Sequence, residues 1–177
     1  DDCRHLIASP LTGQALNEFG SINSLRFNPE KNTYDLAPFN EQTGLWQPCV
    51  SASDTDEMIP GKGYSMRCSE ASGGNGKIIF QGTLNLKNTA VSLQRKNFGW
   101  NCIGNPFPAS IQGSGEESFL AQNINVLDPG FAGIYIWDND ENDYIVFGNW
   151  CPERIAPGQG FMVKARNEGS VVHFNTN

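Results

Sequence analysis

Four aromatic residues in or beside two expected β-hairpins carry the most suggestive chemistry in this sequence. Trp46 lies in the first hairpin, whereas Trp137 and Tyr144 lie in the second and Trp150 follows it. A flat ring can pack against the C–H face of a sugar while nearby Asn and Asp side chains bond its hydroxyl groups. The predicted ligand-binding residues are Trp46, Trp137, Tyr144, Trp150, Asp138 and Asp140. The alternative is that these rings fill the core, as large aromatic residues in strands often do.

The second hairpin is the preferred place for a sugar, because its turn combines aromatic neighbours with acidic residues. Residues 138–143 include four Asp and Glu residues, whereas the corresponding residues 40–44 of the first hairpin include one. We expect one hairpin to bind ligand and the other to serve packing.

The same acidic turn has the spacing of a calcium loop. Asp138, Asp140 and Asn142 alternate as the first three oxygen ligands of such a loop do. The glycine expected next is replaced by Asp143, and the closing Glu is absent. A solvated hairpin turn is therefore the favoured interpretation, calcium binding is the alternative, and no other cofactor is expected.

No catalytic motif accompanies these residues. The Gly61-x-Gly63 and Gly158-x-Gly160 pairs lack the Lys-Ser/Thr of a phosphate-binding loop and read as turn glycines. His5 and His173 lie in expected strands, without a Gly-x-Ser-x-Gly or His-Glu-x-x-His motif nearby. The sequence predicts a protein that is not an enzyme.

Composition excludes two classes of partner. With a formal charge of −7 and only 12 Lys and Arg residues, the chain has no basic stripe for phosphates, so nucleic acid is not an expected partner. No apolar run approaches the roughly 20 residues that a membrane-spanning helix needs, so no membrane insertion is expected.

The five cysteines point to an oxidising compartment. Cys3, Cys49, Cys68, Cys102 and Cys151 are widely spread and show no CxxC spacing, which argues against zinc. Two disulfide bridges and one free thiol are expected, with the pairing left open; five buried, reduced cysteines are the alternative. The chain does not begin with Met, and we interpret it as a mature domain of a longer secreted or cell-surface protein.

An internal repeat organises the elements that position these residues. Residues 7–10 (IASP) match 103–106 (IGNP), and residues 60–64 (PGKGY) match 157–161 (PGQGF). The second motif begins 50 residues after Pro10 in one half and 51 after Pro106 in the other. Apolar runs at 77–80 and 171–174 close the halves. We predict two pseudo-symmetric halves, about 1–90 and 91–177, within one domain, 1–177.

The fold class follows from turn residues and alternation. The 19 Gly and 10 Pro residues favour many short strands and tight turns, so we predict an all-β sandwich. Hairpins are expected at 34–50, around 73–76 and at 134–147, with further strands at 5–8, 64–68, 82–94 and 160–165. Helical segments are expected at 17–19 and 116–122. Trp100, Phe80 and Phe174 are expected in a common core.

Three segments of the second half resemble a known bacterial pattern. They are GWNCIGNPFPAS (99–110), IYIWDNDENDY (134–144) and IAPGQGFMVKA (155–165). Together they are similar to modules of large exported and cell-surface proteins of Bacteroidetes, associated with type IX secretion. The resemblance implies an exported β-sandwich module beside enzymes, adhesins or sorting domains. It implies no catalytic residues.

The sequence thus predicts a non-catalytic carbohydrate-binding or adhesive module whose partners are a polysaccharide or glycan and the neighbouring domains of its parent protein. A purely structural spacer is one alternative, and a glycan-active enzyme is another. A binding module should expose aromatic rings, whereas a spacer should bury Trp46, Trp137 and Trp150.

Overall fold

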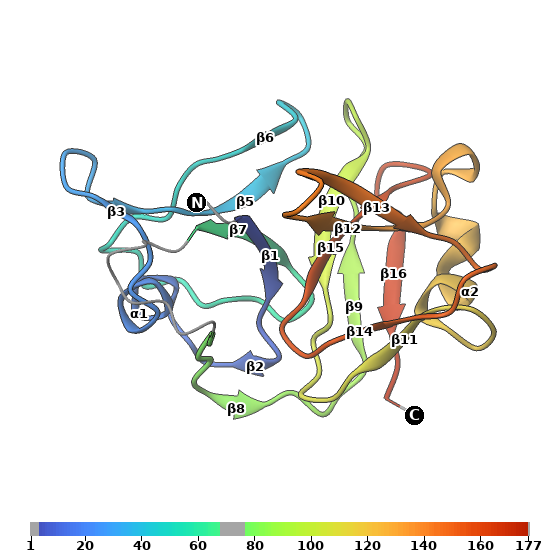
Figure 1. Ribbon diagram of the computed structural model, residues 1–177, viewed down its shortest axis with the longest axis horizontal. Helices are drawn as coiled ribbons and strands as arrows, with labels where there is room; N and C mark the ends of the chain where they lie inside the picture. The colour runs from blue at the N-terminus through green and yellow to red at the C-terminus, as the bar shows by residue number, and fades with distance from the viewer. Residues whose placement is uncertain (1–3, 68–76, 177) are drawn as a thin grey trace.

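The computed structural model describes residues 4–67 and 77–176 and confirms the all-β prediction. Two four-stranded antiparallel sheets form its centre (Figure 1). The first has the strand order β1-β7-β5-β6, and the second has the order β10-β15-β12-β13. Their bounds are β1 Arg4–Ala8, β5 Leu36–Asn40, β6 Leu45–Trp46, β7 Gly63–Arg67, β10 Trp100–Gly104, β12 Ile134–Asp138, β13 Asp143–Phe147 and β15 Gly160–Lys164.

Short strand pairs and small helices surround these sheets. The pairs are β2 (Leu11–Thr12) with β8 (Thr83–Leu84), β3 (Phe27–Asn28) with β4 (Thr33–Tyr34), β11 (Ile111–Ser114) with β14 (Glu153–Ile155), and β9 (Thr89–Ser92) with β16 (Val171–Phe174). The helices are α1 (Leu16–Ile22), α2 (Phe119–Asn123) and the 3-10 turns η2 (Ile124–Val126) and η3 (Pro129–Phe131). No helix within the described ranges is long and apolar enough to cross a membrane.

The two central sheets match in topology and register. Ile7 pairs with Tyr64 in the first sheet, and Ile103 pairs with Phe161 in the second. In both sheets the first strand pairs with the strand of the Pro-Gly-x-Gly motif, and a hairpin continues the sheet. The matched arrangement supports the predicted pseudo-symmetry, while a common origin by duplication stays a prediction.

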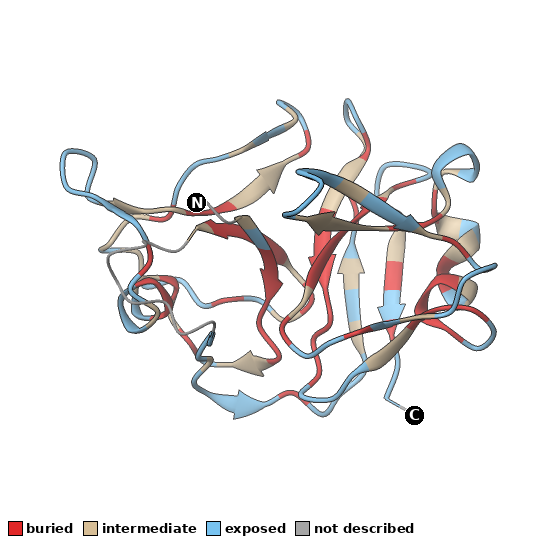
Figure 2. Cartoon of the chain, viewed as in Figure 1, coloured by how far each residue is buried: buried red, intermediate tan, exposed pale blue. Residues whose placement is uncertain are grey.

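Each sheet has its own core, and the opposite faces of the two sheets pack together. Along β1, Ile7 joins the core of the first half, whereas Leu6 points the other way. Leu6, Cys102 and Met162 form the buried centre of a contact between the halves, which we call the seam. The buried strands β1, β10 and β15 lie together in the middle of the molecule (Figure 2).

Reciprocal backbone hydrogen bonds join the halves across the seam. The N–H of Ala8 donates to the carbonyl of Gly158 at 3.0 Å, and the N–H of Gly104 donates to that of Gly61 at 3.1 Å. Gly61 and Gly158 have φ angles of 82° and 76°, a conformation that favours glycine. The first glycine of each Pro-Gly-x-Gly motif therefore shapes a loop that bonds the opposite half.

The second glycine of each motif permits close backbone contact at the seam. A Cβ atom at Gly63 would lie 2.9 Å from the backbone carbonyl carbon of Cys102, and one at Gly160 would lie 2.8 Å from the backbone nitrogen of Ile7. Both separations are too short for a carbon side chain. The turn-glycine interpretation is thus correct for the first glycine and incomplete for the second.

Several local predictions are corrected. Residues 77–80 form no strand; Ile78 and Ile79 are exposed, and Phe80 packs on Phe19 of α1 with ring centroids 5.2 Å apart. Trp100 is half-buried at the rim of the seam and not in the core. Tyr135 packs edge to face on its ring at 4.7 Å, and the Lys164 ammonium lies 5.5 Å from the ring centroid. Phe174 is buried as expected, but it lies in the core of the second half, whereas Phe80 packs on the core of the first half, so the predicted common core is wrong.

Both helices differ from their predicted bounds. Helix α1 extends beyond the turn expected at 17–19. Helix α2 begins after Ser118, whose hydroxyl accepts the Ala121 N–H at 3.1 Å, and not at residue 116. Glu117 has a φ angle of 53°, which a right-handed helix cannot include. Between 82 and 94, only 83–84 and 89–92 form strands.

The cysteines do not form two bridges. Cys49, Cys102 and Cys151 are free thiols, which leaves too few cysteines for the two predicted disulfides. Cys3 and Cys68, like the hairpin turn predicted at 73–76, lie outside the described residues.

Candidate functional site

The aromatic pair of the second hairpin belongs to the seam. The rings of Trp137 and Tyr144 pack edge to face with centroids 5.1 Å apart, and both lie against the buried cluster at the seam. The guanidinium of Arg4 lies 5.5 Å from the centroid of Trp137, and the indole N–H donates to the Asn139 side chain at 3.2 Å. Arg4 and Asn139 therefore contact the Trp137 ring and its indole N–H, which are groups that a sugar would need for stacking and hydrogen bonding.

Trp150 is separate from that pair. It follows the end of β13 that is opposite to the hairpin turn, and it is 79% exposed. Its ring lies over Gly148, where any added Cβ would meet it. The structure therefore does not bring Trp150 together with Trp137 and Tyr144, as a single site in the second half would require.

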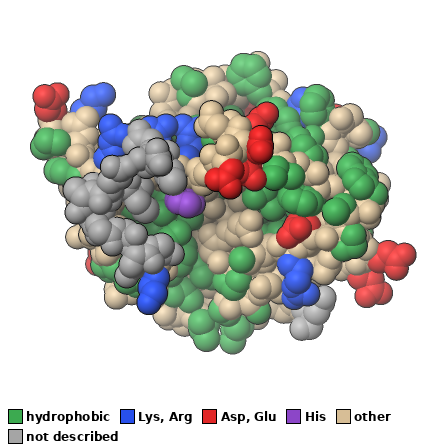
Figure 3. All heavy atoms as spheres, viewed as in Figure 1, with side chains coloured by type: hydrophobic (Ala, Val, Ile, Leu, Met, Phe, Trp, Pro, Cys, Tyr) green, Lys and Arg blue, Asp and Glu red, His purple; other side chains and the backbone are tan. Residues whose placement is uncertain are grey.

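The acidic residues after β12 form the predicted hairpin turn. One oxygen of Asp138 accepts the N–H groups of Asp140 at 2.7 Å and Glu141 at 3.2 Å, and Asn142 has a φ angle of 52°. Figure 3 shows acidic side chains gathered near the middle of the face in view. In the described part of the chain, no group of three or more His, Cys, Asp and Glu residues could hold a metal ion. One oxygen of Asp138 is thus bonded within the turn, and calcium binding by Asp138, Asp140 and Asn142 stays a prediction.

The first hairpin closes in the same way but has a different role. Asn40 accepts the N–H groups of Gln42 and Thr43 at 3.0 and 3.2 Å, and Gly44 has a φ angle of 69°. Glu41 is only 2% exposed. Its carboxylate accepts three backbone N–H groups of the second half, from Lys96 at 3.1 Å, Asn97 at 2.8 Å and Gly99 at 2.6 Å.

These donors also set the ionisation of Glu41. Burial by itself raises the pKa of the carboxyl group, but the backbone N–H groups of Gly99, Asn97, Lys96 and Phe98 outweigh burial and hold the pKa below its usual value. Glu41 is therefore a charged connection between the halves. The sequence gives no signal for this role, because the partners lie 55 to 58 residues away.

The predicted residue Trp46 lines a hollow of about 730 Å³ on the first half. Three aromatic rings border this Trp46 hollow, from Phe27 on β3, Tyr34 on β4 and Trp46 on β6. Phe27 is exposed, and the other two rings are half-buried. Polar side chains that also line it include Asn28, Asp35, Gln47 and Arg67. The hollow thus combines one exposed and two half-buried aromatic rings with hydrogen-bonding groups.

The local sequence holds these rings in place. The Asn28 side chain accepts the Lys31 N–H at 3.1 Å, and Asn32 has a φ angle of 51°, so the β3–β4 hairpin turns tightly. The rings of Phe27 and Tyr34 lie 5.4 Å apart across that hairpin.

Two contacts anchor the remaining rings of the hollow. Tyr34 rests on Gly20, where an added Cβ would come within 2.5 Å of the ring. Trp46 packs edge to face on Phe39 at 5.1 Å. Rings held in this way lose little freedom when a ligand binds.

Cys49 also lines this hollow, as a free thiol. Burial, followed by the charge of Asp35, raises the pKa of the Cys49 thiol above its ordinary value, although Lys31 and Arg67 oppose the shift. At neutral pH the group is a thiol and not the reactive thiolate.

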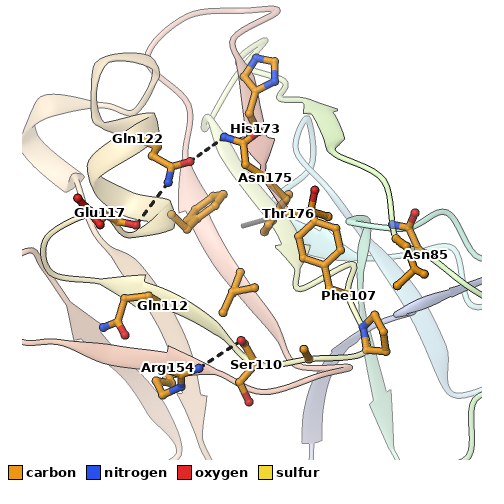
Figure 4. A pocket seen from close by; sticks show the side chains of 16 residues that line it. Asn85, Phe107, Ser110, Gln112, Glu117, Gln122, Arg154, His173, Asn175 and Thr176 are labelled. Carbon is orange, nitrogen blue, oxygen red and sulfur yellow. Dashed lines mark hydrogen bonds between the residues drawn. The ribbon is translucent and has the colours of Figure 1, made fainter.

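A second hollow, of about 570 Å³, lies in the second half between α2, β11 and β16 (Figure 4). Its rings offer little surface, since Phe107, Phe119 and Phe174 are 6%, 5% and 1% exposed. Gln122 already bonds Asn175 at 2.8 Å.

Other polar groups of the Figure 4 hollow also form hydrogen bonds within the protein. Arg154 donates to the carbonyl of Ser110 at 3.3 Å, and the amide of Gln112 donates to the carbonyl of Ser114 at 2.7 Å. This hollow is less suited to a sugar than the Trp46 hollow.

A third hollow, of about 590 Å³, lies between the halves. Gln47 and Pro48 line both this groove and the Trp46 hollow, so the two adjoin there. Strand β6 ends at Trp46, and the cis peptide bond between Gln47 and Pro48 follows it. We call this hollow the inter-half groove.

Fold and site together define an all-β protein with two matched sheets joined at a seam and a ring-lined hollow on one half. The chain belongs to the family described as "Domain of unknown function (DUF8693)", whose model matches residues 5–149. The match includes both hairpins and the entire Trp46 hollow. No curated protein and no solved structure matches the chain.

Proposed function

We propose that this protein is a non-catalytic carbohydrate-binding module and that the sugar binds in the Trp46 hollow. The observation that carries the proposal is the convergence of Phe27, Tyr34 and Trp46 on one hollow beside carboxamide and charged side chains. Sugar rings have apolar C–H faces and polar edges, and such a surface complements both.

The expected affinity is modest. Stacking on one ring contributes on the order of 1–2 kcal/mol, so one sugar binds with a Kd nearer millimolar than nanomolar. Tight attachment to a polymer then requires several sugar units or several modules acting together. A weak module is useful only within a larger protein, which agrees with the proposal of an exported parent protein with neighbouring domains.

The structural spacer is the second candidate, and one observation favours it. Trp137 and Tyr144 pack into the seam, as they would in a protein that needs only stability. A spacer should also bury Trp46 and Trp150. Trp46 packs on the same seam cluster and is half-buried like Trp137 and Tyr144, but it also lines a hollow, and Trp150 is 79% exposed. Binding is therefore the better supported function.

The test is calorimetric titration of wild type and three variants with a panel of neutral and acidic hexasaccharides. We expect Phe27→Ala and Trp46→Ala to weaken binding about tenfold or more. Trp150→Ala removes an equally large but distant ring and should leave the affinity unchanged. Because Trp46 also packs on Phe39, the exposed Phe27 provides the variant that preserves the fold.

Two outcomes would overturn the proposal. If Trp150→Ala abolishes binding while Phe27→Ala does not, the site lies in the second half. If no member of the panel binds, the spacer becomes the preferred function.

A further inference from the structure

The inter-half groove has a charge opposite to that of the whole chain. The sequence carries a net charge of −7, yet the residues that line the groove include Lys62 and Lys96 and no Asp or Glu. Lys62 comes from the first half and Lys96 from the second. In residues 4–67 and 77–176, neither ammonium group pairs with a carboxylate.

The nearest acidic residue in sequence does not change this. Glu41 lies between two groove residues, Asn40 and Gln42, but its carboxylate is buried on the backbone N–H groups of residues 96–99. Those donors already satisfy it. Both lysines therefore line a groove whose lining contains no exposed carboxylate, and the Lys62 ammonium lies 5.4 Å from the centroid of the Tyr64 ring.

Carboxamide groups complete the groove. Gln42, Gln47 and Gln94 line it, and all three are exposed. Carboxamides both donate and accept hydrogen bonds, which suits sugar hydroxyls, while two ammonium groups suit an anionic substituent. The groove adjoins the Trp46 hollow at Gln47 and Pro48.

We propose that the inter-half groove is a second subsite and that the ligand is an acidic polysaccharide. One sugar unit stacks in the Trp46 hollow, and a following unit places its carboxylate or sulfate between Lys62 and Lys96. The inference rests on the proposed function, and it specifies the chemical class of the sugar.

The pseudo-equivalent positions of the second half would repel such a ligand. Asp138 and Asp140 replace Asn40 and Gln42 at the hairpin turn, and Gln159 replaces Lys62 in the Pro-Gly-x-Gly motif. None of these side chains is fully buried, so packing of the seam does not require this difference. The asymmetry fits a binding role on one side only.

The experiment compares charged ligands with their neutral counterparts. Hexamers of α-1,4-linked galacturonic acid and of mannuronic acid are titrated beside the same hexamers with methyl-esterified carboxyl groups. We expect wild type to bind at least one acid hexamer about tenfold more tightly than its ester. The ratio should fall as salt rises, because screening weakens the lysine contacts.

Matched variants locate the effect. Lys62→Gln and Lys96→Gln should bring the acid-to-ester ratio close to one, whereas Lys87→Gln, which makes the same charge change outside the groove, should preserve it. Equal affinity for acids and esters, with Phe27→Ala still weakening both, would overturn the acidic subsite and leave the proposed function standing. Equal effects of all three Lys variants would also overturn it. If neither acid nor ester binds but a neutral hexasaccharide of the panel does, the acidic subsite fails and the proposed function stands; if no member of the panel binds, both fail.

Discussion

The tips of the two hairpins, residues 40–44 and 138–142, share a backbone and differ in what they contact. Asn40 and Asp138 each accept two N–H groups of their own turn, and Gly44 and Asn142 both have positive φ angles. The turn of the first half is buried through Glu41, whereas the turn of the second half is acidic and exposed. The two turns therefore share a backbone conformation but differ in the charge and burial of their side chains.

Each hairpin tip also accepts hydrogen bonds from the opposite half through one side chain. Glu41 accepts three N–H groups before β10, while Asn139 accepts the N–H of Arg4, at the start of β1, at 3.0 Å. The first contact uses a buried charge, and the second uses an exposed amide. We infer that the first tip stabilises the seam more strongly than the second tip does.

The largest losses of stability are expected on substitution of the second glycine of each Pro-Gly-x-Gly motif, where the two halves are most alike. Gly63→Ala and Gly160→Ala each place a Cβ against the backbone of the opposite half, and each should destabilise the protein by about 3 kcal/mol. Urea unfolding measures both. Gly130→Ala is the control, because only one side-chain atom lies near its added Cβ. A large effect at one site alone would break the pseudo-symmetry of the seam.

Removal of the tip side chains should destabilise the protein by unequal amounts in the two halves. Glu41→Ala leaves three backbone donors without their charged acceptor and should cost about 2–3 kcal/mol. Asn139→Ala, at the equivalent position, should cost about 1 kcal/mol or less, since its contacts are exposed. Thermal unfolding of both variants gives the comparison. Equal losses would contradict the unequal roles of the tips.

The Glu41 contact should also depend on pH. The folded-state pKa of Glu41 is lowered, so its stabilising effect is present above the unfolded value of about 4.5 and is lost as pH falls through the lower folded value. The stability difference between wild type and Glu41→Gln should therefore be constant near neutral pH and shrink below about pH 4. Unfolding in urea between pH 3 and 7 tests it. A difference that grows on acidification would exclude the charged contact.

The smallest perturbation is thiol labelling, which reports on the seam without changing it. Cys102 is buried at the seam, whereas Cys49 and Cys151 are exposed; burial raises the pKa of the Cys102 and Cys49 thiols, so access is what separates Cys102 from the other two. Native protein should react with iodoacetamide at Cys49 and Cys151 and spare Cys102 until unfolding. Mass spectrometry of labelled peptides locates the sites. Rapid labelling of Cys102 in the native protein would mean that the seam opens easily.

Local patterns were sufficient for much of the backbone. Alternation and turn residues predicted the hairpin at 134–147 correctly, because its strands and its Asx-closed turn depend on neighbours in sequence. The spacing of the Pro-Gly-x-Gly motifs likewise predicted two matched sheets. The strand prediction for residues 77–80 was wrong, because an apolar run forms a strand only when a partner strand is available.

The candidate site depended on tertiary structure. Trp46 could be selected from sequence as a large ring beside polar residues, but Phe27 and Tyr34 could not be joined to it, because their hollow is assembled from separate strands. The second hairpin has the more suggestive sequence, yet its pair of rings packs into the seam. Residue type and spacing fix which side chains can stack or bond, whereas exposure, and hence ligand access, is decided by how the two sheets pack against each other.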